Sequence, residues 1–282
     1  MAKMIDGKLV SKKITEWVAR EVKDMTDAGH RKPFLGVILI GDNPASKIYV
    51  GRKETACREV GFDTTTIRFD EDVPEDEVIQ QIREFNNNPN VDGILVQLPL
   101  PEHMDFLRVF NELSPHKDID GLTPHSQGLL ALNRAHHIPC TPKGIIKLIK
   151  AIDFEMKGVH AAVVGRSALV GSPIAKLLTH HHATVTTVHS RTKNPWEFTS
   201  TADLLVVAAG VPKLVDEKWV KKDAVVIDVG IHRVDDKICG DVDFDRVKEK
   251  ASWITPVPGG VGPMTIAALL TNCFNAYKTH VS

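Results

Sequence analysis

The sequence lacks most of the features that assign a protein to a special class. Its 282 residues include four cysteines but no C-x-x-C pair, so neither a zinc site nor a disulfide framework is indicated. No apolar run is long enough to span a membrane. The start, MAKMIDGKLVSKK, lacks the apolar core of a signal peptide and the arginines of a transit sequence. These absences predict a protein of the reducing cytoplasm.

The sequence also lacks an excess of charge of either sign. Lys and Arg total 35, Asp and Glu total 36, and the formal net charge is −1. This balance gives no electrostatic reason to expect a nucleic acid or an anionic membrane as partner. Hydrophobic residues make up 43% and charged residues 25%, which is typical of a soluble globular protein of one large or two ordinary domains.

Short apolar runs alternate with segments of helical period, and this alternation predicts an α/β protein with parallel strands. The first series of expected strands is FLGVILIG, TTIRF and VDGILVQLPLP, and the second is VHAAVVG, ATVTTVH, ADLLVVAAG and AVVIDVG. The segment SPHKDIDGLTPHSQGLL has no clean period and is expected to be a long connection. Long connections in compact domains are often functional.

Two helices are expected to carry one apolar stripe each, and a third has clear end signals. The first stripe comprises Val10, Ile14, Trp17, Val18, Val22 and Met25. The second lies on residues 264–279 and comprises Ile266, Leu269, Leu270, Cys273, Phe274 and Tyr277. Thr141 is the expected N-cap of a third helix, with Pro142 at its first position. The second stripe needs a packing partner, so we predict that this helix packs against another part of the chain.

The stretch VVGRSALVGSP has the context of a phosphate-binding turn. It follows an apolar strand and opens a helix, whose N-terminus offers free N–H groups and a positive dipole end. It departs from G-x-G-x-x-G because Ser167 replaces the second glycine and Gly171 comes one residue late. Taken alone, the turn from Gly165 is equally compatible with a packing role.

The end of the next strand indicates which dinucleotide the turn would bind. An NAD site would place an acidic residue there for the ribose hydroxyl. The chain has Ser190 and Arg191 instead, and Arg166 adds a second cation in the turn. A hydroxyl beside a guanidinium suits a 2′-phosphate. The sequence therefore predicts NADP as the cofactor.

A lysine occupies an unexpected place in SKIYVGRKETACREVG. Tyr49, Lys53, Ala56 and Cys57 fall on one helical face, although lysines are rarely buried without a partner. The alternative is a lysine that extends its amine to solvent from the end of the stripe. A partly desolvated lysine binds its proton less tightly and can act as an acid or base. Gln97 and Asp120 stand at or after strand ends, where functional residues of parallel sheets gather.

Other polar clusters are interpreted as structural. HKDIDG and GDVDFD do not match a calcium loop, so Asp118 and the second cluster are expected to be solvated loop acids, and no metal site is predicted. Residues 180–182 are consecutive histidines expected to form a polar helix end. Cys57 and Cys140 are interpreted as buried small residues.

Together the motifs resemble one family, the bifunctional methylenetetrahydrofolate dehydrogenase/methenyltetrahydrofolate cyclohydrolases. The resemblance rests on YVGRKETACREVGF, GILVQLPLP, KDIDGLTPHSQG, PCTPKG, VVGRSALVGSP, TVHSRT and TPVPGGVGPMT. It implies an enzyme of one-carbon metabolism. In such an enzyme NADP would take a hydride from 5,10-methylenetetrahydrofolate, and water would then open the methenyl product to 10-formyltetrahydrofolate.

The same resemblance implies a homodimer built from two-lobed chains. Residues 1–138 would form an N-terminal α/β catalytic domain that binds folate, completed by the C-terminal helix 264–282. Residues 139–263 would form a Rossmann-type domain that binds NADP.

The resemblance also implies roles for individual residues. Lys53 would be the general acid/base of hydrolysis, Gln97 would hold its amine, Tyr49 would line the folate site, and Asp120 would bind the pterin amino group. Gly262 and Pro263 would close the other side of the substrate pocket. The implied cofactor contacts are Gly165, Arg166, Ser167, Ser190, Arg191 and Ile231, with Thr141 and Thr265 near the nicotinamide.

The chain departs modestly from the family's pattern, as at His232, where asparagine is common. Two alternatives stay open at this point. One is an NADP dehydrogenase for another small substrate, such as a shikimate-type enzyme. The other is a cyclohydrolase without redox function, or a nucleotide-sensing binding protein, but the retained GRSALVG and HSRT disfavour it.

Overall fold

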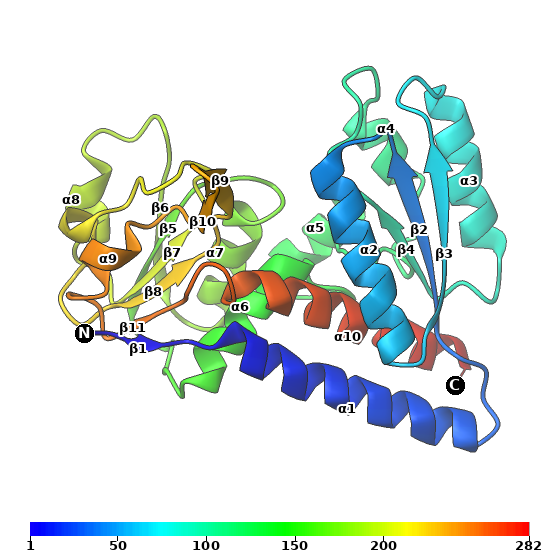
Figure 1. Cartoon of the computed structure of the whole chain (residues 1–282), viewed down its shortest axis with the longest axis horizontal. Coiled ribbons are helices and arrows are strands. Elements are labelled where there is room, and N and C mark those ends of the chain that lie inside the picture. Colours follow the sequence, from blue (N-terminus) through cyan, green and yellow to red (C-terminus); the bar gives the residue numbers. More distant parts are fainter. Residues whose placement is uncertain (282) are drawn as a thin grey trace. The chain divides into compact units, whose positions relative to one another are not determined.

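The structure, a computed structural model, describes residues 1–281 and divides into two compact units (Figure 1). Unit 1 comprises Met1–Lys12 and Thr141–Thr265, and unit 2 comprises Lys13–Cys140 with the chain from Ile266 onward. Each unit contains a parallel sheet covered by helices. The predicted α/β class is confirmed, with a C-terminal helix that returns to the lobe formed by the N-terminal half.

Unit 2 is built on a three-stranded parallel sheet in the order β3-β2-β4. Its strands are β2 (Phe34–Ile40), β3 (Asp63–Phe69) and β4 (Gly93–Val96). In register, Ile38 of β2 pairs with Ile67 of β3 and with Val96 of β4. The helices between and after the strands are α2 (Pro44–Glu59), α3 (Glu75–Asn87), α4 (Phe106–Asn111) and α5 (Pro124–Ala131).

Alternation along β2 divides the apolar side chains of unit 2 between the two faces of the sheet. Leu35 and Val37 belong to one buried cluster and Ile38 to another. The first cluster also takes side chains from α1 (Gly7–Asp27), α2 and α10 (Val261–Val281), and the second takes them from α3 and α4. Strand β2 is therefore apolar on both faces, as in other parallel sheets covered on both sides.

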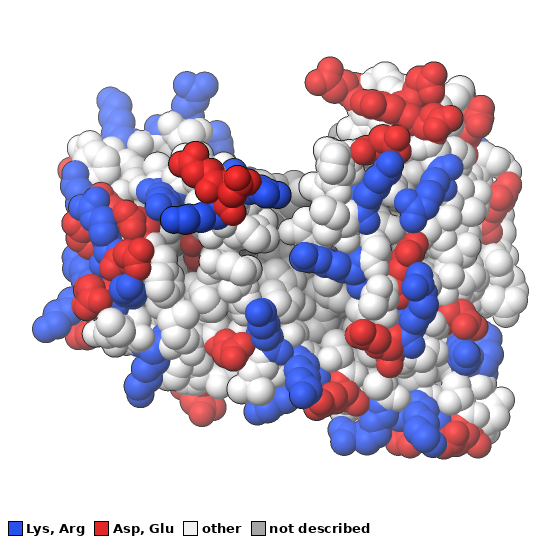
Figure 2. All heavy atoms as spheres, viewed as in Figure 1, with Lys and Arg blue, Asp and Glu red and all other residues white. Residues whose placement is uncertain are grey.

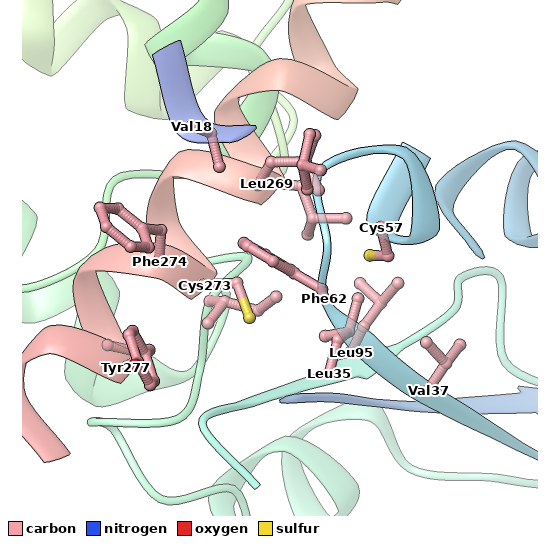
Figure 3. Close-up of a cluster of buried hydrophobic side chains, with 14 of the residues drawn as sticks. Val18, Leu35, Val37, Cys57, Phe62, Leu95, Leu269, Cys273, Phe274 and Tyr277 are labelled. Atoms are coloured by element: carbon pink, nitrogen blue, oxygen red, sulfur yellow. The ribbon is translucent and has the colours of Figure 1, made fainter. Parts of the chain in front are cut away.

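The C-terminal helix supplies the largest side chains of the first cluster (Figure 3). Phe274 and Tyr277 are both fully buried, and the ring of Phe274 meets that of Trp17 edge to face, with centroids 5.9 Å apart. The predicted apolar stripe of the tail thus has its partner in unit 2. Its docking on the lobe formed by the N-terminal half is confirmed.

Polar groups fix the end of this helix. The fully buried carboxylate of Asp92 accepts two hydrogen bonds from Arg31, at 2.7 Å each, and lies 2.9 Å from Nδ1 of His280. Tyr277 donates its hydroxyl to the carbonyl of Arg31 at 2.6 Å. Removing one member would leave buried polar groups without partners, so the network holds the helix in one register.

A second buried lysine shows what a structural lysine looks like in this fold. Lys117 is 7% exposed, and its ammonium donates to the carbonyls of Phe85, Asn86 and Asn88 at 2.8–3.0 Å. These carbonyls lie at the C-terminal end of α3, where a cation also meets the negative end of the helix dipole. Burial lowers the pKa of Lys117.

Unit 1 contains a six-stranded parallel sheet in the order β1-β11-β8-β7-β5-β6. The strands are β1 (Lys3–Met4), β5 (His160–Val164), β6 (Thr184–Val188), β7 (Leu204–Val207), β8 (Val225–Asp228) and β11 (Trp253–Ile254). The chain passes from β5 to β6 on one side and then to β7 on the other. That reversal marks the point where open α/β sheets bind ligands.

The ends of the central strands are level. Val164, the last residue of β5, pairs with Val188 of β6 and Val207 of β7. The loops that follow these strands therefore begin side by side. The other elements of unit 1 are the helices α6 (Cys140–Ala151), α7 (Gly171–His180), α8 (Pro195–Thr199) and α9 (Phe244–Val247), a 3₁₀ turn η1 (Glu217–Trp219), and the antiparallel hairpin β9 (His232–Val234) and β10 (Lys237–Cys239).

Two local expectations need correction. The supposed connection 114–130 contains α5, where Thr123 caps the helix by accepting from the Ser126 N–H and Pro124 stands at the first helical position. Helix α6 begins at Cys140, so Thr141 lies inside the helix and does not cap it. The short first strand, β1, was not predicted from the sequence, and it pairs with β11 of unit 1.

Packing of the C-terminal helix makes a stability prediction. Phe274→Ala should lower the free energy of unfolding of unit 2 by about 3–5 kcal/mol, because it removes a fully buried ring. Urea unfolding followed by the fluorescence of Trp17, which touches the ring, measures the loss. Phe198→Ala is the matched control, because this phenylalanine of α8 is 46% exposed. Equal unfolding midpoints for the two variants would contradict the packing assignment.

Candidate functional site

The predicted lysine group lies in unit 2, on α2 and at the end of β4. Asn43 caps α2 by accepting from the Ala45 and Ser46 N–H groups, and Pro44 opens the helix. Lys53 is 7% exposed, whereas Tyr49, one turn earlier, is half-buried. The expectation that Lys53 sits within the buried stripe is confirmed.

The side-chain amide of Gln97 is held in one orientation and accepts a hydrogen bond from the amine of Lys53. Lys53 Nζ donates to Gln97 Oε1 at 3.1 Å, and Gln97 Nε2 donates to the Leu98 carbonyl at 2.6 Å. The backbone N–H of Gln97 also extends the sheet by bonding to the carbonyl of Ile38. Because the amide N–H₂ is bound to a carbonyl, the amide oxygen must face the amine. The amine is thus held by one neutral acceptor, in contrast to the three carbonyls around Lys117.

Asp118 holds the loop that presents Asp120. We expected Asp118 to be a solvated loop acid, and this was wrong, because it is 1% exposed. Its carboxylate accepts from the N–H groups of Leu122 and Thr123 and from the hydroxyl of Ser126, at 2.7–3.1 Å. A buried carboxylate needs such donors, and here they come from the following turn and from the first turn of α5. Asp120, two residues on, remains partly exposed.

Neither end of the glycine turn of unit 1, Gly165 or Gly171, has room for a side chain. Gly165 has φ +117°, and a Cβ there would lie 2.1 Å from the carbonyl oxygen of Ala208. A Cβ on Gly171 would lie 2.4 Å from the carbonyl oxygen of Gly165. Ser167, which replaces the expected middle glycine, accepts from the N–H groups of Val170 and Gly171 through its hydroxyl. The serine that departs from the glycine motif therefore supplies an acceptor for two N–H groups of the turn where α7 begins.

The loop after β6 forms a tight turn that exposes two of the predicted cofactor contacts. The N–H of Arg191 bonds to Nδ1 of His189, and the N–H of Thr192 bonds to the carbonyl of His189. Ser190 and Arg191 are exposed at its tip, and Gly165 N–H bonds to the carbonyl of Val188 at its base. The turn therefore stands next to the glycine turn and offers a hydroxyl and a guanidinium without a neighbouring carboxylate.

Two buried carboxylates organise the neighbouring loops. Asp228, at the end of β8, accepts from the N–H groups of Gly230, Asp241 and Val242 at 3.0 Å each. Burial raises the pKa of Asp228 to about 7, although these N–H donors act in the opposite direction. Asp241 is fully buried and accepts from Ala209 and Gly210. The expectation that the GDVDFD acids are solvated was wrong for Asp241.

The remaining predicted contacts also belong to unit 1. The hydroxyls of Thr141 and Thr265 are 3.0 Å apart and hydrogen-bonded. Ile231 is 49% exposed on the loop after β8, and Gly262 is exposed in the first turn of α10, followed by the half-buried Pro263. The structure thus places four of the proposed substrate contacts in unit 2, and Gly262 and Pro263 in unit 1 with the cofactor contacts.

Other predicted features are structural. Cys57 and Cys140 are buried cysteines that form no disulfide, and burial raises the pKa of Cys57 to about 12. His180 ends α7 and His181 is its C-cap, as expected of a polar helix end. Across residues 1–281, no cluster of three His, Cys, Asp or Glu side chains is arranged to hold a metal ion. Among the described helices, none is long and apolar enough to cross a membrane.

Charges of both signs are interspersed over the face seen in Figure 2. Acidic side chains gather over the loops after β3 and β4, where the exposed residues include Asp70, Glu71, Asp72 and Glu102. This mixed surface differs from the continuous basic face of a nucleic-acid-binding domain. That the protein has no nucleic acid partner stays a prediction.

The residues that sequence reasoning missed are the buried acids Asp118, Asp228 and Asp241. Each stands beside a glycine-containing loop at a strand end, as in the stretches DIDG, IDVG and CGDVD. A Cβ on Gly230 or Gly240 would lie within 2.3 Å of the Asp241 or Asp228 carboxylate, respectively. A glycine beside an acidic residue was therefore the available signal of a buried acid, because only a residue without a side chain leaves room for the carboxylate.

Comparison with known proteins gives two family matches. Residues 5–120 match the catalytic domain of tetrahydrofolate dehydrogenase/cyclohydrolase, and residues 139–281 match its NAD(P)-binding domain. The chain is 50% identical over 279 residues to the bifunctional protein FolD of Aquifex aeolicus, which covers 99% of this chain and 96% of that protein.

Two solved structures are similar along the whole chain. The bifunctional FolD methylenetetrahydrofolate dehydrogenase/cyclohydrolase of Campylobacter jejuni has a TM-score of 0.97 and 42% identity, covering 99% of each chain. The Trypanosoma brucei N5,N10-methylenetetrahydrofolate dehydrogenase-cyclohydrolase, solved with NADP and an inhibitor, has a TM-score of 0.96 and 35% identity, covering 99% of this chain and 98% of that one.

Proposed function

The chain belongs to the tetrahydrofolate dehydrogenase/cyclohydrolase family, and from this premise we propose a role for each residue of the two sites. The enzyme oxidises 5,10-methylenetetrahydrofolate with NADP and hydrolyses the methenyl product to 10-formyltetrahydrofolate. Both steps belong to one-carbon metabolism. The observation that carries the residue assignment is the buried amine of Lys53, held by the oxygen of Gln97.

Lys53 is the general acid/base of the hydrolytic step. Water must lose a proton as it attacks the methenyl carbon, and the pterin nitrogen N5 must gain one as its bond to that carbon breaks. One amine at the reacting atoms can accept the first proton and donate the second. Gln97 serves this role better than a carboxylate would, because a neutral acceptor orients the amine without stabilising its charged form as strongly.

Asp120 and Tyr49 bind the substrate in this assignment. The pterin ring carries an amino group and an adjacent ring N–H, which a carboxylate can accept together. Asp120 is partly exposed, and its loop is fixed by the bonds to Asp118. Tyr49 lies one helical turn before Lys53 and is half-buried, so its ring can pack against the folate while its edge stays wet.

The residues of unit 1 fit NADP. Gly165 lets the chain turn tightly against the carbonyl of Ala208, and the exposed turn from Arg166 then leads to the N-terminus of α7, where backbone N–H groups suit a pyrophosphate. Ser190 and Arg191 would hold the 2′-phosphate. Thr141, Thr265 and Ile231 would line the nicotinamide. When bound, NADP supplies the hydride acceptor.

We also propose domain limits that follow the compact units. The folate domain would comprise residues 13–140 completed by the C-terminal helix, and Gly262 and Pro263 stay predicted substrate contacts. Residues 1–12 would belong to the cofactor domain, because β1 extends its sheet through β11. A cytoplasmic location agrees with four free cysteines, and cell fractionation tests it.

We propose that the active form is a homodimer. Unit 1 exposes apolar side chains near its hairpin, and the N–H of Lys213 bonds to the carbonyl of Gly240, which brings the 211–215 loop beside the end of β10. The exposed apolar residues are Val211, Leu214, Val234 and Ile238. Grouped apolar side chains of this kind mark protein interfaces, and a two-fold dimer would cover the same patch on both chains.

Lys53→Met tests the proton relay. The variant keeps the apolar stem and loses the amine, so it should fold and bind folate but lose cyclohydrolase activity by about 10²-fold or more. Dehydrogenase activity should fall less, because hydride transfer needs no proton relay. The two rates are followed by methenyltetrahydrofolate absorbance and by NADPH absorbance.

Lys47→Met is the control for this variant. It makes the same change on the same helix at an exposed lysine paired with Asp42, and both activities should stay near the parent values. Hydrolysis by Lys53→Met at the parent rate would show that this lysine only binds or packs.

Arg191→Ala tests the assignment of the 2′-phosphate. The apparent binding constant for NADP should rise at least about tenfold, because a hydrogen bond to a charged group contributes roughly 1.5–3 kcal/mol. The constant for NAD, which lacks that phosphate, should stay nearly the same. Arg246→Ala, which removes an exposed arginine of α9, should change neither. Equal losses for NADP and NAD in Arg191→Ala would refute the assignment.

Ile238→Lys tests the dimer patch. A charge at a side chain that is 49% exposed in the monomer costs little there but would be buried in the dimer, so light scattering should report the mass of one chain. Leu107→Lys, at a 55% exposed leucine of α4, should leave the dimer intact. A parent protein with the mass of one chain at micromolar concentration would rule out the homodimer.

A further inference from the structure

A polar cluster that neither reaction step uses lies behind the loop that follows β7. Its centre is the carboxylate of Asp241, which is fully buried. Oδ2 accepts from the N–H groups of Ala209 and Gly210 at 2.6 and 2.9 Å. Oδ1 lies 2.6 Å from Nε2 of His232. The carboxylate therefore joins the β7 loop to the first residue of the hairpin β9–β10.

The direction of the histidine contact follows from its partner. An ionised carboxylate only accepts hydrogen bonds, so Nε2 of His232 must carry the hydrogen. A donor on Oδ1 leaves Oδ2 free for the two backbone N–H groups and fixes the rotation of the carboxylate plane. Short contacts to a charged acceptor are the stronger kind of hydrogen bond. His232 thus helps to fix the rotation of the carboxylate that faces the loop.

The loop at residues 208–210 forms part of the wall of the glycine turn. The N–H of Ala208 bonds to the carbonyl of Val164, directly before Gly165. The carbonyl of Ala208 approaches Gly165 so closely that a Cβ there would lie 2.1 Å away. A shift of this loop by a few tenths of an ångström would therefore move the turn or strain it.

Asp228 fixes the other side of the cluster without help from the histidine. It accepts from the backbone N–H groups of Asp241 and Val242, and so holds the main chain at that point. His232 then acts on the side chain of Asp241 alone. It is also the member that solvent reaches, with a side chain 20% exposed against 0% for Asp241. A substitution at His232 should therefore leave the core intact.

We propose that His232 is a positioning residue for the dinucleotide. By orienting the Asp241 carboxylate it keeps the 208–210 loop seated against Gly165, and so sets the affinity of the Gly165–Gly171 turn for the pyrophosphate. The inference rests on the proposed function, in which this turn binds NADP. It concerns the part that NADP and NAD share, whereas Arg191 concerns the phosphate that only NADP carries.

His232→Leu and His232→Gln separate the hydrogen bond from the bulk of the ring. Leu fills similar volume and lacks a donor, so the dissociation constants for NADP and NAD, measured by calorimetry, should both rise about three- to tenfold. Gln can place an N–H near the position of Nε2, so it should bind both within about twofold of the parent. Arg233→Gln, the neighbouring exposed residue, is the control and should match the parent.

Kinetics distinguish positioning from general damage. In His232→Leu the KM for NADP should rise, while kcat at saturating NADP and the cyclohydrolase rate should stay near the parent values, because hydrolysis uses no cofactor chemistry. The inference is overturned if the leucine variant binds both dinucleotides like the parent. It is also overturned if only NADP binding weakens, or if the glutamine variant is as weak as the leucine variant. A parent enzyme that binds neither dinucleotide would instead overturn the proposed function.

Discussion

A buried carboxylate no longer contacts water, so the protein must supply hydrogen-bond donors for it. This constraint shapes both proposed sites. Asp118 draws the N–H groups of Leu122 and Thr123 into a turn and so presents the partly exposed Asp120. Asp228 and Asp241 do the same for the loops at the ends of β7 and β8. Strands alone would leave these loops free to move. The buried acids turn them into fixed surfaces, which is what a site needs to bind its ligand without ordering it first.

The two buried lysines differ in their partners, in line with the structural role of one and the proposed catalytic role of the other. Lys53 and Lys117 are both 7% exposed. Three carbonyls at the end of a helix surround the ammonium of Lys117 and satisfy all of its donors. The amine of Lys53 donates to one amide oxygen, that of Gln97. An ammonium with remaining donor capacity at a substrate site is available to a reacting molecule, whereas a saturated one serves the fold. Burial alone therefore does not identify a catalytic lysine.

Patterns of apolar residues predicted the long helices and the strands of both sheets except the two-residue strands β1 and β11. The stripe from Ile266 to Tyr277 predicted even the helix that returns to unit 2. The acids of DIDG and GDVD were misjudged, because their burial depends on donors from Thr123 and Ala209, which no local period reveals. The hairpin β9–β10 was missed, since it is short and its apolar side chains stay exposed. Contacts between residues far apart in the chain, unlike the periodic spacing of apolar residues, leave no recognisable pattern in a single sequence.

Neither unit is a continuous stretch of chain, and this has a consequence for synthesis. The first strand, β1, cannot pair until β11, near the other end of the chain, has been synthesised. The core around Leu35 and Leu95 is not fully covered until the last helix has been synthesised. Growing chains usually fold domain by domain from the N-terminus. Here a ribosome would carry a sheet whose apolar face lacks its cover until almost every residue has been made. The nascent chain should therefore depend on chaperones that shield that face, and a product truncated before α10 should be degraded rather than persist as a folded half.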